Sequence, residues 1–105
     1  MVYAIYTTEN FDKEMMKLEN PEQERIQKIF LQLKDNPYVG DPLRYKFLRE
    51  KRIKEKRIYF LIYDDLMAVL IVALSDKKTQ QEVIDHIVRD LDLFKSYLKE
   101  QIEKN

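Results

Sequence analysis

The chain has 105 residues, with 19 Lys and Arg against 19 Asp and Glu, one His, one Gly and no Cys. This length builds one domain with a single sizeable core and excludes two packed domains. The lack of Cys excludes disulfides, thiolate zinc sites and Cys nucleophiles, and a lone His excludes a His-rich metal cage. Apolar residues make up 45% of the chain, which argues against a wholly disordered protein. The net charge of zero argues, at first, against a nucleic-acid partner.

The charge is nevertheless concentrated in one segment. Residues 43–58 hold eight basic and two acidic side chains, a net charge of +6, whereas residues 1–42 and 59–105 each have a net charge of −3. Such a cluster is typical of a phosphate-binding surface, which the whole-chain pI of about 6.6 hides. The alternative is a solvated hairpin, because Lys-rich strand edges also protect sheets from aggregation.

The first part of the chain predicts a strand followed by a helical hairpin. β-branched and aromatic residues favour a strand at Val2–Thr7. Thr8 can cap the helix that follows. A second helix is expected to start with Asn20 as its N-cap and Pro21 as its first helical residue, and to end at residues 35–37.

The rest of the chain predicts a loop at residues 40–42, three strands and a long helix. Tyr45–Arg49 and Lys56–Tyr63 favour strands. In the second, alternation places Ile58, Phe60 and Ile62 on one face, and the other face holds Arg57, Tyr59, Leu61 and Tyr63. Leu66–Ser75 is apolar on both faces, which is typical of a covered central strand. Short connections predict that these three strands form an antiparallel meander. The remaining segment, Thr79–Lys104, is expected to be one helix.

The apolar residues of this last helix are three or four positions apart. That spacing suits packing against its own sheet or a coiled-coil seam in a homodimer. The residues are Ile84, Ile87, Leu91, Phe94 and Leu98. The order β-α-α-β-β-β-α predicts a two-layer α+β fold in which the helical hairpin backs the sheet.

No secretory signal or membrane span is expected. The N-terminus lacks a basic region before its short apolar stretch. The longest apolar run, residues 66–74, is far shorter than the roughly 20 residues that cross a bilayer. A soluble cytoplasmic protein is therefore expected.

Four segments carry a recognisable pattern: Gly40–Leu43, Leu48–Glu50, Lys56–Phe60 and Ser75–Gln80. Together they resemble the RelE/ParE superfamily of toxin–antitoxin toxins. Gly40–Leu43 (GDPL) is similar to the "G-x-P-L" loop of the superfamily, and Lys56–Phe60 (KRIYF) to its "Y-R-x-x-Y" strand. Ser75–Gln80 (SDKKTQ) is similar to the "F-x-K-K-T-Q" segment of the HigB-like (phage Gp49-like) branch. Leu48–Glu50 falls where that branch has an "E-L/I-R" strand. The resemblance covers roughly residues 2–90, and identifies residues 1–105 as a single toxin-like domain with a C-terminal helix at about 79–104.

The resemblance implies a small domain that cleaves messenger RNA on the ribosome without a metal or other cofactor, and that an antitoxin neutralises. The ParE branch shares the fold but targets DNA gyrase, so a gyrase-targeting or degenerate toxin, or a homodimeric interaction module, is the alternative. Cleavage without metal needs a base for the 2′-OH, cations for the dianionic phosphorane and an acid for the leaving 5′-oxygen. Crowded lysines can act in these steps, because neighbouring cations lower the pKa of a Lys from about 10.4 toward neutrality.

The resemblance assigns residues to these roles. Arg57 is the cation expected on the reacting phosphate, and Lys77 is expected as an acid or phosphate contact. Arg52 and Lys54 fall near the basic positions of the preceding strand and complete the expected catalytic set. The register of that strand is open by two residues, so Lys51 and Lys56 stay eligible and the base is unassigned. The expected RNA contacts are cations and aromatic residues of the same region. They are Arg49, Lys51, Lys56, Tyr59, Tyr63 and Lys78.

Other features of the sequence weigh on these roles. Arg57 has an alternative role in a sheet-surface salt bridge to Glu50 or Glu55. Some RelE toxins place a catalytic aromatic about six residues beyond the basic residue, and that position is Val83 here. Asp64–Asp65 is interpreted as a turn rather than a metal site, since no spaced ligand accompanies it.

Overall fold

The computed structural model describes residues 2–104, whose strands form one five-stranded sheet in the order β1-β5-β4-β3-β2. The strands are β1 Ala4–Thr7, β2 Asp41–Pro42, β3 Leu48–Ile53, β4 Lys56–Tyr63 and β5 Ala68–Asp76. β3, β4 and β5 pair antiparallel, which confirms the predicted meander. β1 lies parallel to β5, and the short β2 pairs antiparallel with β3 at the opposite edge.

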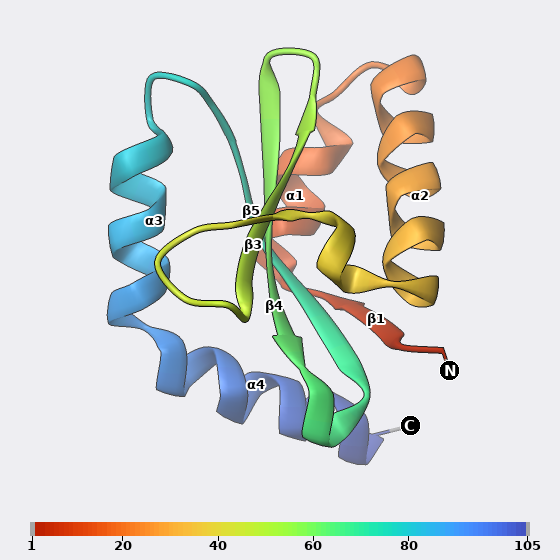
Figure 1. Ribbon diagram of the computed structural model, residues 1–105. Helices are drawn as coiled ribbons and strands as arrows, with labels where there is room; N and C mark the ends of the chain where they lie inside the picture. The colour runs from red at the N-terminus through yellow and green to blue at the C-terminus, as the bar shows by residue number, and fades with distance from the viewer. Residues whose placement is uncertain (1, 105) are drawn as a thin grey trace.

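Helices cover both faces of this sheet (Figure 1). The four α-helices within residues 2–104 are α1 Glu9–Met16, α2 Asn20–Asp35, α3 Gln80–Arg89 and α4 Leu91–Lys104. The α+β class and the hairpin of α1 and α2 against one face are confirmed. The second face is also covered, by α3 and α4, and this adds a layer to the two-layer prediction. None of the helices described has the length and apolar character needed to cross a membrane.

The alternation of β4 divides the core in two. Ile58, Phe60 and Ile62 pack with α1 and α2, whereas Tyr59 and Leu61 pack with α3 and α4. Burying each large apolar side chain contributes about 1.5–3 kcal/mol. Arg57 is two residues before Tyr59, so it shares the face that α3 covers.

The single glycine holds the loop before β2 against the sheet. A Cβ at Gly40 would lie 2.6 Å from Cζ of Phe60 and 2.9 Å from the carbonyl oxygen of Glu50. The loop can approach the sheet this closely only because residue 40 has no side chain. This approach seats β2 beside β3, the strand that carries the cationic segment.

The predicted strand at Tyr45–Arg49 is wrong in position. The strand runs from Leu48 to Ile53 instead, and residues 43–47 form a loop. In that loop the exposed rings of Tyr45 and Phe47 stack on each other, with centroids 5.0 Å apart and planes 9° apart. Residues two positions apart also share one face of a strand, so this spacing led to the prediction of a strand here.

One of the two predicted helix caps is confirmed. Oγ1 of Thr8 accepts a hydrogen bond from the Phe11 N–H at 3.1 Å, as an N-cap does. For α2 the prediction is wrong by one residue, because Glu19 is the N-cap and Asn20 is already helical. The predicted loop at residues 40–42 likewise contributes two residues to β2.

The prediction of one helix over 79–104 is wrong, because the chain breaks at Asp90 between α3 and α4. The N–H of Asp90 donates to carbonyls of His86 and Ile87, and its own carbonyl accepts from Phe94. A straight helix of 26 residues would span about 39 Å, whereas the longest dimension of the molecule is 32 Å. The break returns α4 to the sheet, as Figure 1 shows.

The burial of the apolar residues in α3 and α4 distinguishes packing on their own sheet from a coiled-coil seam in a homodimer. Ile84 is 7% exposed, Ile87 is 1% exposed and Leu98 is fully buried, all in the core beneath α3 and α4. These side chains pack on their own sheet. A coiled-coil seam through all five residues is therefore wrong, because the first two and the last are buried within the chain and Leu91 and Phe94 are half-buried.

Candidate functional site

A hollow of about 890 Å³ lies where the hairpin of β3 and β4 adjoins the turn between β5 and α3. Five cations and two carboxylates line it: Arg52, Lys54, Glu55, Arg57, Asp76, Lys77 and Lys78. The four residues predicted to be catalytic therefore meet in one place, together with Lys78. They come from two segments that the sheet brings side by side, since Lys56 of β4 is paired with Asp76 of β5.

Strand register places two of these cations opposite each other. Arg52 of β3 is the partner of Arg57 on β4, and Arg57 is in turn the partner of Ser75 on β5. Like charges directly opposite in an antiparallel pair destabilise a sheet. A dianionic ligand between the two guanidinium groups would remove this repulsion, and Arg is well suited to contact a phosphate with two donors.

Lys54 lies in the two-residue turn of this hairpin and has a left-handed backbone, with a φ of 53°. Gly is the residue that such a turn favours, because a side chain in the left-handed region costs roughly 1–2 kcal/mol. Backbone outliers of this kind are concentrated at functional sites. The strained residue here is one that lines the hollow.

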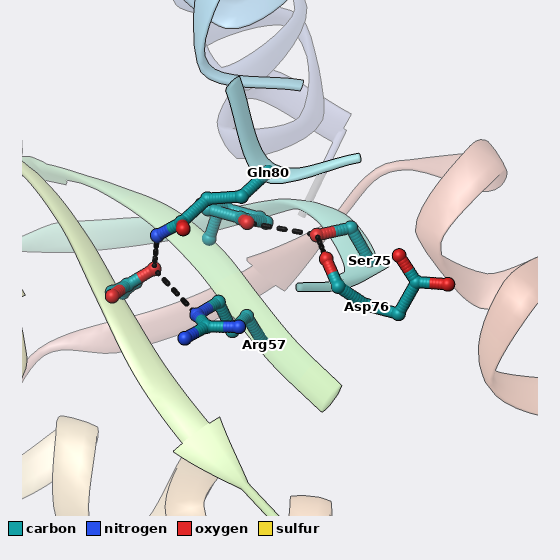
Figure 2. Close-up of polar contacts among 6 residues, drawn as sticks. Arg57, Ser75, Asp76 and Gln80 are labelled. Carbon is teal, nitrogen blue, oxygen red and sulfur yellow. Dashed lines mark hydrogen bonds and ion pairs between the residues drawn. The ribbon is translucent and has the colours of Figure 1, made fainter. Parts of the chain in front are cut away.

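Arg57 is the least exposed cation of the hollow, at 6%. Its Nε lies 3.5 Å from Oε2 of Glu50, and the amide of Gln80 donates to the same oxygen at 2.9 Å (Figure 2). The contact with Glu50 is an ion pair without a hydrogen bond, since Nε has no hydrogen-bond partner among the described residues. The salt-bridge alternative for Arg57 is thus confirmed with Glu50, while Arg57 also lines the hollow.

Tyr59 and Ser75 lie beneath the cations. The Tyr59 hydroxyl and Ser75 Oγ share a hydrogen bond of 2.8 Å, and Ser75 also donates to the carbonyl of Asp76 at 3.0 Å. Burial raises the pKa of Tyr59 above its ordinary value, so it stays a neutral hydroxyl. The prediction that Tyr59 stacks on RNA bases is wrong, because its side chain is fully buried in the core.

Asp76 fixes the turn that presents Lys77 and Lys78. Its Oδ1 accepts hydrogen bonds from the backbone N–H of Thr79 at 3.1 Å and from Thr79 Oγ1 at 3.2 Å. The hydrogen bond from the backbone of Thr79 is the main cause that holds the pKa of Asp76 below its ordinary value. The carboxylate is therefore ionised at neutral pH, and the two lysines stand exposed beside it.

Two of the predicted RNA contacts lie away from the hollow. The Arg49 guanidinium donates to the carbonyls of Gly40 at 2.8 Å and Lys46 at 2.9 Å, and packs 4.9 Å from the centre of the Tyr38 ring. Arg49 therefore holds the loops around β2 together. Tyr63 is at the opposite end of β4, where burial and, to a smaller extent, the carboxylate of Asp65 raise its pKa to about 12.

The other two strand lysines flank the hollow on its outer sides. Lys51 lies between β3 and α2, and Lys56 lies between α1 and the end of β5. Neither lines the hollow itself, so Lys54 is its one lysine from the β3–β4 hairpin.

Sequence reasoning missed Gln80 and treated Glu50 only as an alternative partner of Arg57. Glu50 shares a face with Arg52 because the two are two residues apart on β3, which is a signal that sequence offers. The contact between Gln80 and Glu50 has no local signal. Within residues 2–104 no group of three or more acidic or His side chains is arranged to hold a metal ion.

Neither a protein-family profile nor a curated protein sequence matches this chain. Several solved structures, by contrast, match it. The E. coli toxin RelE, a double arginine-to-alanine mutant in the free state, has a TM-score of 0.69 at 16% identity and covers 83% of this chain and 99% of its own. The toxin–antitoxin complex RelBE2 from Mycobacterium tuberculosis has a TM-score of 0.65 at 21% identity, over 73% of this chain and 100% of its own.

An archaeal RelE–RelB complex from Pyrococcus horikoshii OT3 agrees, with a TM-score of 0.67 at 15% identity over 73% of this chain and 97% of its own. At such identities the likeness shows the fold. The chain has the fold of RelE toxins, as the resemblance of its sequence predicted. The closer similarity of residues 75–80 to the HigB-like branch stays a prediction.

Proposed function

We propose that this chain is the toxin of a toxin–antitoxin pair, and that it cleaves messenger RNA on the ribosome without a metal ion. The observation that supports this most directly is the convergence of Arg52, Lys54, Arg57 and Lys77 on one hollow. Their charge suits an RNA phosphate, and the fold shared with RelE toxins supports the same class of activity.

In the proposed reaction the 2′-oxygen of a ribose attacks the neighbouring phosphorus and the bond from phosphorus to the 5′-oxygen breaks. The products are a 2′,3′-cyclic phosphate and a 5′-hydroxyl. A base must accept the 2′-OH proton and an acid must protonate the leaving oxygen. Arg52 cannot act as the base because a guanidinium does not lose its proton in proteins. Lys54 is then the base from the hairpin, and Lys77 is placed to be the acid.

Arg57 and Arg52 stabilise the phosphorane in this scheme. Among the described residues, Arg57 Nε is the one buried side-chain nitrogen or oxygen without a hydrogen-bond partner, and it faces Glu50. The two terminal nitrogens of Arg57 remain for the phosphate oxygens. Removing one such preorganised donor from a charge-stabilising site typically costs about 10²–10³ in rate.

The proposed partners are the ribosome with its message, and an antitoxin protein. The RelE structures from M. tuberculosis and P. horikoshii are complexes with an antitoxin. Covering the hollow would neutralise its five cations and exclude RNA. Because ribosomes are the target, the proposed location is the cytoplasm.

The test is induction of the chain in a bacterial host, with mapping of message ends by primer extension. The wild type should arrest growth and truncate messages, and Arg57→Ala with Lys77→Ala should abolish both. Lys95→Ala, an exposed site on α4, is the control and should remain toxic. Purified protein should cleave ribosome-bound message.

Other results would contradict the proposal. Intact messages with a DNA-damage response would instead indicate a toxin that targets gyrase. Neither toxicity nor RNA binding would indicate an interaction module. Circular dichroism of each variant shows whether it is folded, because Arg57 is buried and its loss can disturb the sheet.

A further inference from the structure

A second groove adjoins the hollow on the other side of the β3–β4 hairpin. It has a volume of about 420 Å³ and lies between α2 and β3. The residues that line it are Arg25, Lys28, Ile29, Gln32, Lys51, Arg52, Ile53 and Lys54. Arg52 and Lys54 line both the groove and the hollow, so one cationic surface runs from α3 over the hairpin to α2.

This α2–β3 groove contains no carboxylate in its lining. Within residues 2–104, no acidic group lies within 4.0 Å of the charged nitrogens of Arg25, Lys28 or Lys51. Glu22 and Glu24 belong to the same helix, yet neither forms an ion pair there. The cations of the groove therefore have no ion-pair partner among residues 2–104, and an anionic ligand would supply one.

The groove has cationic walls and an apolar floor. Arg25, Lys28 and Gln32 are exposed and share one face of α2, because they are three and four residues apart. Ile29 is 8% exposed and Ile53 is 5% exposed, so both lie beneath these polar side chains. Such a lining suits a chain with regularly spaced negative charges and less polar sugars and bases between them.

Two other grooves near this end of the molecule differ in charge. The one beside Lys56 is lined by Glu14 and Asp76, and the one between α1 and α3 is lined by Glu14 and Glu82. Lys17 and Lys56 balance the carboxylates of the first groove, and the lining of the second contains no Lys or Arg, so neither has the excess of cations that would attract a polyanion. The α2–β3 groove is the continuation whose lining is free of acidic residues.

We infer that the α2–β3 groove binds the phosphodiester backbone of RNA next to the phosphate that the hollow holds. The inference rests on the function proposed for the hollow, and adds Arg25, Lys28 and Lys51 as backbone contacts. Counting charge along the chain missed the first two, because they lie in a segment with a net charge of −3. Packing α2 against β3 is what joins them to the cationic segment.

The test compares Arg25→Gln/Lys28→Gln with Lys95→Gln/Lys99→Gln. Both double variants remove two exposed helical cations, and the second pair lies on α4. The probes are 2′-O-methyl RNAs of about 4 and about 12 nucleotides, within the range of single-strand site sizes. They lack the attacking hydroxyl, so binding is measured without cleavage, by fluorescence anisotropy over a range of salt concentrations.

The groove variant should bind the longer RNA about tenfold more weakly, and its salt slope should fall by about 1.4, since each single-strand phosphate contact contributes about 0.7. The short RNA fits within the hollow and should bind the groove variant and the wild type equally. The α4 variant should match the wild type with both RNAs. Equal affinity and slope of the groove variant and the wild type, with the longer RNA and with purified ribosomes, would overturn the inference.

The ribosome measurement identifies the source of the RNA. Weaker binding to both the longer RNA and the ribosome assigns the groove to the message. Weaker binding to the ribosome alone assigns it to ribosomal RNA. Loss of antitoxin binding with unchanged RNA binding would overturn the inference in favour of an acidic protein segment. If the chain bound RNA through Arg25 and Lys28 but cleaved no RNA, the proposed nuclease activity would be wrong. The proposed binding of RNA in the α2–β3 groove would still hold.

Discussion

Charged side chains at the two ends of β4 differ in how they are paired. At the Tyr63 end, the Asp64 carboxylate accepts hydrogen bonds of 2.6 Å from the hydroxyls of both Tyr3 and Tyr38. At the Arg57 end, five cations share a hollow with two carboxylates, and among those cations only Arg57 has an ion pair within 4.0 Å in the described residues. At one end two hydroxyl donors satisfy the Asp64 carboxylate, whereas at the other end like charges lie together.

The difference separates an end that holds the fold together from the end that we propose binds RNA. The Asp64 contacts join the N-terminal segment, the loop after α2 and the turn after β4, so they hold the fold together. Buried or partly buried polar groups that serve only the fold are normally paired. Unpaired cations and a left-handed Lys cost stability, and such costs are typical of sites where a ligand completes the interactions.

The largest effect is expected from breaking the one ion pair of the cationic end. Glu50→Gln leaves the Arg57 guanidinium buried without its counter-ion, while Gln80 can still donate to the new amide oxygen. Removing one member of a buried pair typically costs about 3–5 kcal/mol. We expect a loss near about 3 kcal/mol in the free energy of unfolding, measured with urea.

The matched control is Glu55→Gln, which removes an exposed carboxylate that lines the same hollow. Exposed substitutions of this kind change stability by less than about 0.5 kcal/mol. If Glu50→Gln proved as mild as Glu55→Gln, Arg57 would be well hydrated and the ion pair would not hold it in place.

The second prediction uses the strained turn of the cationic end. Lys54→Gly relieves the left-handed backbone, so the free energy of unfolding should stay level or rise by up to about 1 kcal/mol. RNA cleavage should nevertheless fall by at least about tenfold, because the proposed base is gone. Thermal unfolding and a cleavage assay measure the two effects in the same preparation.

Met67 offers the control at the other end, since it has a φ of 47° in the turn before β5. Met67→Gly relieves the same kind of strain away from the cations and should leave cleavage unchanged. Full cleavage by the Lys54→Gly variant would show that another group accepts the 2′-OH proton.

Sequence predicted the fold well where the pattern is local. Lys56–Tyr63 alternates cleanly between two faces, and β4 has the predicted bounds. Tyr45 and Phe47 show the limit, because two aromatic residues at strand spacing also suit a stacked pair in a loop. Asp90 shows another, since the three- and four-residue spacing of the apolar stripe continues through the break between α3 and α4.

The site divides in the same way. Arg57 and Lys77 could be predicted because each lies in a short segment with a recognisable pattern. The hydrogen bond from Gln80 to Glu50 joins residues 30 apart, and Arg25 joins the cationic surface only through the packing of α2. The sequence pattern also did not predict how exposed each side chain is. Tyr59 and Tyr63 lie on the same face of β4, but Tyr59 is fully buried and Tyr63 is half-buried.

The smallest effect is expected at the Tyr63 end of β4, where it tests how Asp64 changes the pKa of Tyr38. Hydrogen bonding to Asp64 is the main cause that raises the pKa of Tyr38 to about 12. The same bonds, first from Tyr3 and then from Tyr38, lower the pKa of Asp64. Asp64→Asn should therefore bring the pKa of Tyr38 back toward about 10, the ordinary value for Tyr. Tyrosinate absorbance measured against pH follows this titration.

The sign of the stability effect follows from these directions. A Tyr whose pKa is raised on folding contributes stability below about pH 10, and loses it as the pH rises through about 12. The lowered pKa of Asp64 means that its contribution is present above its unfolded pKa and lost as the pH falls through the folded value. Both contributions are small because the Asp64 carboxylate, which forms these hydrogen bonds, is exposed to solvent. In the control, Asp65→Asn, the pKa of Tyr63 should stay raised, because burial is its main cause. If the pKa of Tyr38 were still about 12 in the Asp64→Asn variant, burial would be the main cause of the raised pKa of both Tyr38 and Tyr63. Packing rather than Asp64 would then hold this end of the molecule together.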